Sequence, residues 1–143
     1  MKGKIVIIGI IILVVAGFGV VGGYFMNRKL PKKASDFFDT ERVTSIMITD
    51  GNTGQEYIIE ERSEINDYIS ILNSMTFKYE KAKSKSRGWS YSIAAMEGNK
   101  VYCDFEFEDN SRCVIKNSQY MVSNGEFDKL ENKFGLLFQE NIF

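Results

Sequence analysis

The stretch VYCDFEFE, residues 101–108, alternates apolar and polar side chains over its whole length. A period of two puts the two sets on opposite faces of a β-strand, as in an antiparallel sheet with one buried and one solvated face. The segment WSYSI, residues 89–93, repeats the pattern, and Glu97-Gly98-Asn99 supplies turn residues between the two. We therefore expect two antiparallel strands here.

Further strands and two helices surround this pair. Residues 43–49 and 55–60 are rich in β-branched and aromatic side chains, and the turn sequence DGNTG between them predicts a hairpin. Residues 76–80 and 112–116 are predicted to be short strands, with 119–122 continuing the second or adding another. Apolar residues at helical spacing predict a helix from Ser63 through Met75, and a C-terminal helix capped by SNGE at 123–126.

Together these elements predict an α+β fold in the order β-β-α-β-β-β-β-α. One antiparallel sheet of five or six strands would carry both helices on a single face. The other face would meet solvent or a partner, and would present Tyr102, Asp104, Glu106 and Glu108.

An apolar segment precedes this domain. Residues 5–26 are 22 consecutive positions without a formal charge, and as a helix they would span roughly 33 Å, enough to cross a bilayer. We expect a basic N-terminus (1–4), a transmembrane helix in the lipid bilayer (5–26), a basic juxtamembrane linker (27–41) and a soluble α+β domain (42–143). Cleavage as a signal peptide is the alternative, but the segment is long for a signal and lacks an A-x-A-like site.

The orientation in the membrane depends on the flanking charges. Lys2 and Lys4 precede the apolar segment and four basic residues follow it, so the positive-inside rule gives a near tie. A short basic N-terminus before a long apolar stretch has the layout of an uncleaved signal-anchor. On that ground we expect a single-pass protein of a bacterial cell membrane with its domain on the extracytoplasmic side.

Small residues recur along one side of the expected transmembrane helix. Gly9, Ala16, Gly19 and Gly23 fall on one stripe, and the last two form a GxxxG pattern. This stripe would allow a homodimer through the transmembrane helix, but one GxxxG is a weak pattern and glycine is also common in membrane helices that do not pair.

Charge and residue type exclude several functions. All 19 acidic residues and 12 of the 18 basic ones lie beyond residue 33, so that part of the chain has a formal charge of −7 and is poorly suited to bind nucleic acid. The chain has no His, which nearly excludes zinc sites and His-based catalysis. Without a P-loop, Rossmann, G-x-S-x-G or S-x-x-K motif, we expect neither an enzyme nor a cofactor.

The two cysteines, Cys103 and Cys113, are expected to be buried free thiols. If Phe107 lies opposite Cys113, Cys103 sits four residues further along its strand, roughly 13 Å away at 3.3 Å per residue. A disulfide needs Cα atoms within about 7 Å. A shift in register would overturn this expectation.

The turn at residues 50–54 also resembles the start of a calcium loop, with Glu61 at the twelfth position. Gln55 stands at the sixth position, where such loops need glycine, and strands rather than helices are expected on both sides. A plain hairpin turn is therefore favoured.

Two surfaces are candidates for partner binding. One is a basic run, which would contact anionic lipid, wall polymer or an acidic partner unless it is simply a solvated loop. It consists of Lys78, Lys81, Lys83, Lys85 and Arg87. The other is the solvated strand face around Tyr102, Asp104 and Glu106.

The small size, the single anchor and the lack of catalytic motifs favour a non-enzymatic binding or accessory module. It would act at the outer face of a bacterial cytoplasmic membrane through contacts with a protein partner. The alternative is a sensory or small-ligand-binding ectodomain, with Trp89 and Tyr91 as the wall of an apolar pocket. A weaker alternative is a hydrolase that uses carboxylates alone.

Overall fold

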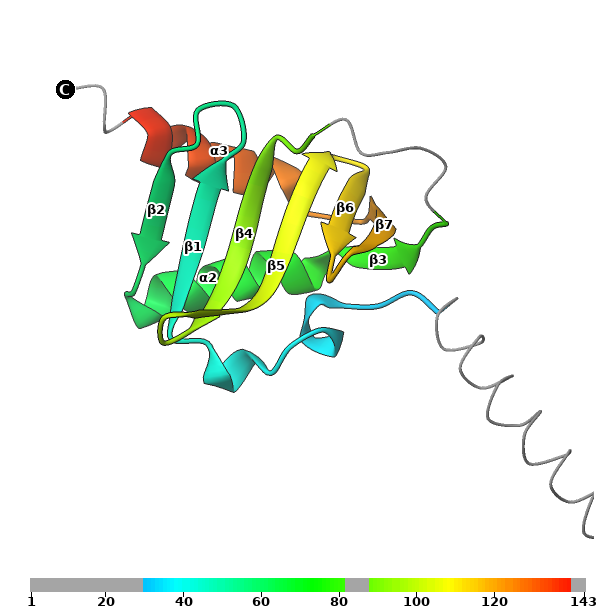
Figure 1. Ribbon diagram of the computed structural model, residues 1–143, viewed down its shortest axis with the longest axis horizontal. Helices are drawn as coiled ribbons and strands as arrows, with labels where there is room; N and C mark the ends of the chain where they lie inside the picture. Colours follow the sequence, from blue (N-terminus) through cyan, green and yellow to red (C-terminus); the bar gives the residue numbers. More distant parts are fainter. Residues whose placement is uncertain (1–29, 82–87, 140–143) are drawn as a thin grey trace, which may run out of the picture. The chain divides into compact units, whose positions relative to one another are not determined.

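A computed structural model describes residues 30–81 and 88–139 and shows an α+β fold on one antiparallel sheet (Figure 1). In these residues, seven strands lie in the order β2-β1-β4-β5-β6-β7-β3. The strands are β1 (Ser45–Asp50), β2 (Glu56–Ile59), β3 (Thr76–Tyr79), β4 (Tyr91–Glu97), β5 (Lys100–Asp109), β6 (Arg112–Ile115) and β7 (Ser118–Ser123). The helices are α2 (Arg62–Ser74) and α3 (Phe127–Gln139), with 3-10 turns η1 (Ala34–Asp36) and η2 (Thr40–Arg42).

The predicted α+β class and antiparallel sheet are confirmed, but five or six strands was too few. Residues 118–123 form a strand of their own because the chain reverses at Lys116 and Asn117, which have φ of 48° and 61°. Two successive residues with positive φ make the tight turn that suits a two-residue hairpin. Strand β7 then pairs with β6 on one side and with β3 on the other.

Both helices lie behind the sheet in Figure 1, as the sequence predicted. Strands β2 and β3 are the two edges of the sheet, so α2, which joins them in sequence, carries the chain across its width. Helix α3 packs beside α2, with the rings of Tyr68 and Phe134 stacked at 6.4 Å between centroids. The helices therefore cover one face together.

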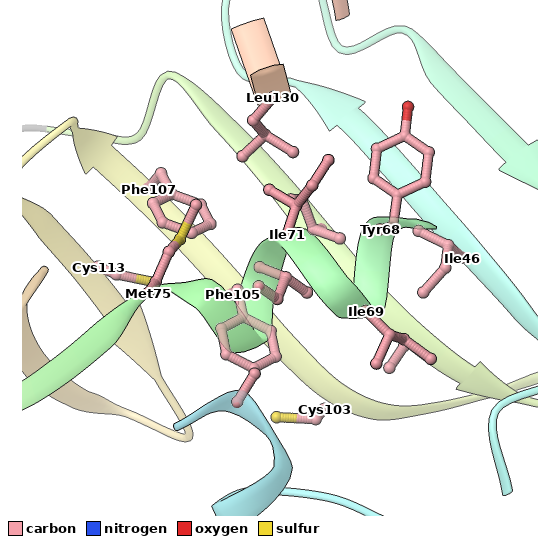
Figure 2. Packing of buried hydrophobic residues seen from close by; sticks show 14 of the residues in the cluster. Ile46, Tyr68, Ile69, Ile71, Met75, Cys103, Phe105, Phe107, Cys113 and Leu130 are labelled. Atoms are coloured by element: carbon pink, nitrogen blue, oxygen red, sulfur yellow. The ribbon is translucent and has the colours of Figure 1, made fainter. Parts of the chain in front are cut away.

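The core fills the layer between the helices and the sheet (Figure 2). The predicted alternation in β5 is realised there: Phe105 and Phe107 are fully buried, with Met75 and Leu130 in the same cluster. Ring contacts join Phe105 to Phe77 at 5.6 Å and Phe107 to Phe127 of α3 at 5.4 Å. Strand β5 thus contacts both the edge strand β3 and helix α3 within one core.

Residues 31–41, assigned to the linker by the sequence analysis, pack on this core and belong to the same compact unit as the sheet. Phe37 contacts the ring of Phe105 at 6.0 Å and Phe38 does so at 5.8 Å. Lys32 forms a bridge to Phe77 of the edge strand, with two backbone hydrogen bonds of 2.8 Å. Buried aromatic side chains and paired backbone groups fix this segment to the domain.

The helix starts differ from the predicted ones by one to four residues. Helix α2 begins at Arg62 because the carboxylate of Glu61, not the hydroxyl of Ser63, accepts the backbone N–H of Glu64. The Ser63 hydroxyl itself donates to that carboxylate. Helix α3 begins at Phe127, and Ser123, the expected cap, ends strand β7.

No helix in residues 30–81 and 88–139 is long and apolar enough to cross a membrane. The predicted transmembrane segment, residues 5–26, lies outside the described residues, and so does its stripe of Gly9, Ala16, Gly19 and Gly23.

The expected register of the cysteines is confirmed, since Phe107 pairs with Cys113 across β5 and β6. Both Cys103 and Cys113 are buried and carry free thiols. Burial raises the pKa of Cys103 to about 11 and that of Cys113 well above its usual value, because an apolar environment disfavours the thiolate.

Both thiols should therefore resist alkylation in the folded protein. At pH 8 a thiol with a pKa of about 11 is only about 0.1% thiolate, whereas an ordinary one near 8.5 is roughly a quarter thiolate. We expect iodoacetamide to label the two cysteines at least about 100-fold more slowly in the native chain than in guanidinium. The intact mass of the protein measures the extent of labelling. An intact mass that is lower by two hydrogen atoms in the absence of reductant would instead indicate a disulfide.

Candidate functional site

A cleft of about 690 Å³ lies where three neighbouring strands meet helix α3. Strand β1 ends at Asp50, β4 begins at Tyr91 and β5 ends at Asp109, and all three are adjacent in the antiparallel sheet, so these residues come to the same end of it. Glu131 and Phe134 of α3 line the opposite wall. The sheet order therefore assembles a site from segments far apart in the sequence.

Aromatic rings form the apolar part of the cleft. Tyr91 stacks on Phe107 at 5.1 Å and meets the edge of Phe134 at 4.6 Å, and Phe138 lies 6.2 Å from Phe134. Burial raises the pKa of the Tyr91 hydroxyl far above its usual value, and the charge of Glu131 adds to the effect. The hydroxyl is buried and, among the described residues, has no hydrogen-bond partner. A buried hydroxyl without a partner is unfavourable, and a ligand that reached it would supply the missing hydrogen bond.

Two carboxylates on the rim are fixed by turns of their own. Asp50 accepts the backbone N–H of Asn52 at 2.8 Å and the hydroxyl of Thr53 at 2.9 Å. Asp109 accepts both the hydroxyl and the N–H of Ser111 at 2.7 Å. These hydrogen bonds lower the pKa of both groups, so both carry a negative charge at neutral pH.

The lip of the cleft is held by contacts between the β1–β2 turn and the start of β4. Gly51 donates its N–H to the carbonyl of Ser90 at 2.9 Å. Its Cα lies against Trp89, so a Cβ added at Gly51 would lie 2.1 Å from the carbonyl oxygen of Trp89 and 2.7 Å from its ring. Ser90 in turn donates its N–H to Phe107 at 2.7 Å and its hydroxyl to Glu108 at 2.9 Å. The turn is thereby positioned before any ligand arrives.

The sequence pointed to this region only in part. Tyr91 lines the cleft, as expected for a ligand-binding domain, whereas Trp89 packs against Gly51 and is not part of the wall. Asp109 and Glu131 were missed, because only the strand order and the placement of α3 bring them near Tyr91. Neither residue lies in a sequence pattern that indicates a binding site.

Metal binding finds no support in the part of the chain that the structure describes. No group of three His, Cys, Asp or Glu side chains there is arranged to hold an ion. Asp50, the first residue of the calcium-like loop, closes its own turn, and Glu61, its twelfth residue, caps α2.

The face of the sheet opposite the helices contains part of the predicted partner surface. Strand register puts Ile58, Met47, Ala94 and Asp104 side by side across β2, β1, β4 and β5. Within the described chain no element covers this row; Ile58 is 64% exposed, whereas Ala94 is buried, at 2% exposed. We call the row, together with Glu106, the open face.

The carboxylates of the open face are partly buried although they lie on the surface. Burial raises the pKa of Asp104, against a hydrogen bond with Ser92 that lowers it, and one oxygen of Asp104 has no partner among the described residues. Burial and the charge of Asp104 raise the pKa of Glu106. Two acidic groups thus share a poorly solvated part of an otherwise flat surface.

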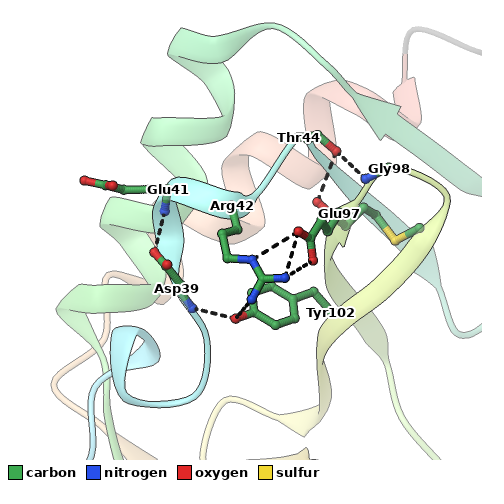
Figure 3. A network of polar contacts seen from close by, with 8 residues as sticks. Asp39, Glu41, Arg42, Thr44, Glu97, Gly98 and Tyr102 are labelled. Atoms are coloured by element: carbon green, nitrogen blue, oxygen red, sulfur yellow. Dashed lines mark hydrogen bonds and ion pairs between the residues drawn. The ribbon is translucent and has the colours of Figure 1, made fainter.

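Tyr102, predicted to lie on that face, belongs instead to a polar network at the end of the sheet (Figure 3). The register passes from Ala95–Cys103 to Met96–Val101, which makes Tyr102 the extra residue of a β-bulge. The guanidinium of Arg42 lies 4.9 Å from the Tyr102 ring and donates three hydrogen bonds of 2.8, 2.9 and 3.0 Å to Glu97. This ring is therefore separated from Asp104 and Glu106.

Only part of the basic run lies within the described residues. Lys78, on β3, and Lys81, just after it, are exposed. Lys83, Lys85 and Arg87 lie outside the described residues.

Comparisons of the chain with protein-family models, with curated proteins and with solved structures gave no match. The function is therefore inferred from geometry and chemistry alone.

Replacing Gly51 with alanine should disturb the lip of the cleft. The added methyl group must displace the Trp89 backbone or ring, so we expect a loss of about 1–3 kcal/mol in unfolding free energy. Trp89 is the only tryptophan, so its emission should shift to the red as the ring moves into water. Gly135→Ala is the matched control, since a Cβ there meets nothing within 4 Å, and it should leave the emission unchanged. An unshifted spectrum in Gly51→Ala would refute the contact.

Proposed function

We propose that this chain is a non-enzymatic, membrane-anchored binding module that holds a protein partner against the open face. Ile58, which is 64% exposed, and the partly buried Met47 support the proposal, because the row that they begin ends beside the partly buried Asp104. An apolar strip beside partly buried carboxylates suits a partner that presents apolar and basic side chains.

The proposal includes a single-pass anchor at residues 5–26 and a domain on the outer face of a bacterial cytoplasmic membrane. Its support is the length and composition of the apolar segment and the signal-anchor layout. The exposed Lys78 and Lys81 at the β3 edge are proposed as a second contact, toward anionic groups.

The orientation can be tested with external protease on intact cells that carry a C-terminal tag. We expect the tag to be lost without lysis, because the signal-anchor layout places the domain outside. A cytoplasmic protein of the same cells, which must stay intact, controls for leakage. Protection of the tag until lysis would place the domain inside and would contradict the extracytoplasmic proposal.

The open face can be tested with a photoreactive amino acid at Ile58 in intact cells. Leu136 is the matched control, since it is an equally exposed apolar residue, at 65% against 64%, on the helix side. We expect a discrete protein adduct from position 58 that position 136 does not give. Reversing the charge by Asp104→Lys should reduce its yield at least about fivefold, because like charges then face the basic partner. The same adducts from both positions, or none from position 58, would refute the proposal.

A second candidate function is a small-ligand-binding ectodomain. The observation that favours it is the cleft, in which the buried Tyr91 hydroxyl has no partner among the described residues. A cleft of about 690 Å³ falls in the usual size range for small-molecule sites. Both functions are compatible in one domain, because the cleft lies at the end of the strands and the open face on their flat side.

A further inference from the structure

We infer that the cleft binds a small organic cation, an ammonium or guanidinium group carried on an apolar stem. This inference rests on the second candidate function, that the cleft is a ligand site. It is carried by the charge of the rim, the aromatic wall and the unpaired Tyr91 hydroxyl, which all favour the same ligand chemistry.

The charge of the rim sets the sign of the ligand. Asp50, Asp109 and Glu131 line the cleft, and none of the described residues that line it is Lys or Arg. The turn hydrogen bonds that keep Asp50 and Asp109 ionised also hold them in place. An anionic ligand would be repelled by three carboxylates, although the charge of Arg112 acts on Asp109, whereas a cation is attracted by all three.

The aromatic wall sets the shape and polarity of the ligand. Tyr91, Phe134 and Phe138 present ring surface to the cleft. The face of an aromatic ring attracts an organic cation, and the rings also bury the apolar stem that carries it. A bare metal ion gains nothing from such a wall and needs several oxygen ligands arranged around it, which the described residues do not provide.

The Tyr91 hydroxyl supplies a directed hydrogen bond. It is buried without a partner among the described residues, and the negative charge of Glu131 acts on it. An N–H group of a bound cation can donate to this oxygen and be attracted by the Glu131 carboxylate at the same time. An unpaired buried polar group is unfavourable, and such a ligand would relieve it.

The inference can be tested with three probes that share one aromatic stem and differ in charge: phenethylammonium, 2-phenylethanol and phenylacetate. Each is titrated into the full chain in detergent, with Trp89 emission and the amide resonances of Asn110 and Ser111 as readouts. We expect phenethylammonium to bind at least about tenfold more tightly than the alcohol, and phenylacetate not to bind, because only the cation is attracted by the carboxylates.

Variants of the protein identify the groups responsible. Glu131→Gln should weaken phenethylammonium binding about tenfold, and Tyr91→Phe about fivefold, since each removes one polar contact and keeps the side-chain volume. Tyr91→Phe should also leave the melting temperature of the unliganded chain unchanged or higher, because it removes an unpaired buried hydroxyl. Asp128→Asn is the matched control: it removes one charge from the same helix away from the cleft and should leave affinity unchanged.

The outcomes separate the inference from the function on which it rests. Binding of phenethylammonium that falls in Glu131→Gln and Tyr91→Phe but not in Asp128→Asn supports the cation. Equal or tighter binding of the alcohol or the phenylacetate at the same resonances overturns the cation inference and leaves a ligand-binding cleft. If no probe of any charge perturbs those resonances, both the inference and the ligand-binding function fail.

Discussion

The burial of Phe105 on the helix side of β5 is the contact on which the other parts of the fold depend. Its ring meets Phe77 from the edge strand β3 and Phe37 and Phe38 from the segment that enters the domain. The polar residues on either side, Asp104 and Glu106, must then lie on the opposite face, because successive side chains of a strand point in opposite directions. One buried ring thus determines both the core and the composition of the open face.

The strand order determines where the cleft forms. Because α2 carries the chain from β2 to the far edge at β3, strand β4 returns beside β1 and the β4–β5 pair occupies the middle of the sheet. The end of β1, the start of β4 and the end of β5 then share one end of the sheet, beside α3. The cleft is the product of this topology, and its residues come from four separate segments.

The two proposed sites differ in physical character. The open face is flat, with an apolar row beside two carboxylates whose burial raises their pKa, which suits the extended surface of a protein. The cleft is concave, with carboxylates whose pKa is lowered by turn hydrogen bonds and an aromatic wall, which suits a compact cation. The pKa of the acidic residues is therefore shifted in opposite directions at the end of these strands and on their open face.

The sequence by itself determined the α+β class, the hairpin at residues 50–54 and the alternation of β5. These features follow from local periodicity and turn chemistry, which short segments encode. Only the tertiary structure decided that β7 pairs with β3, that Tyr102 leaves the open face at a bulge, and that Lys32 pairs with Phe77. It also decided that Asp109 and Glu131 approach Tyr91, because contacts between distant segments depend on how all elements pack together.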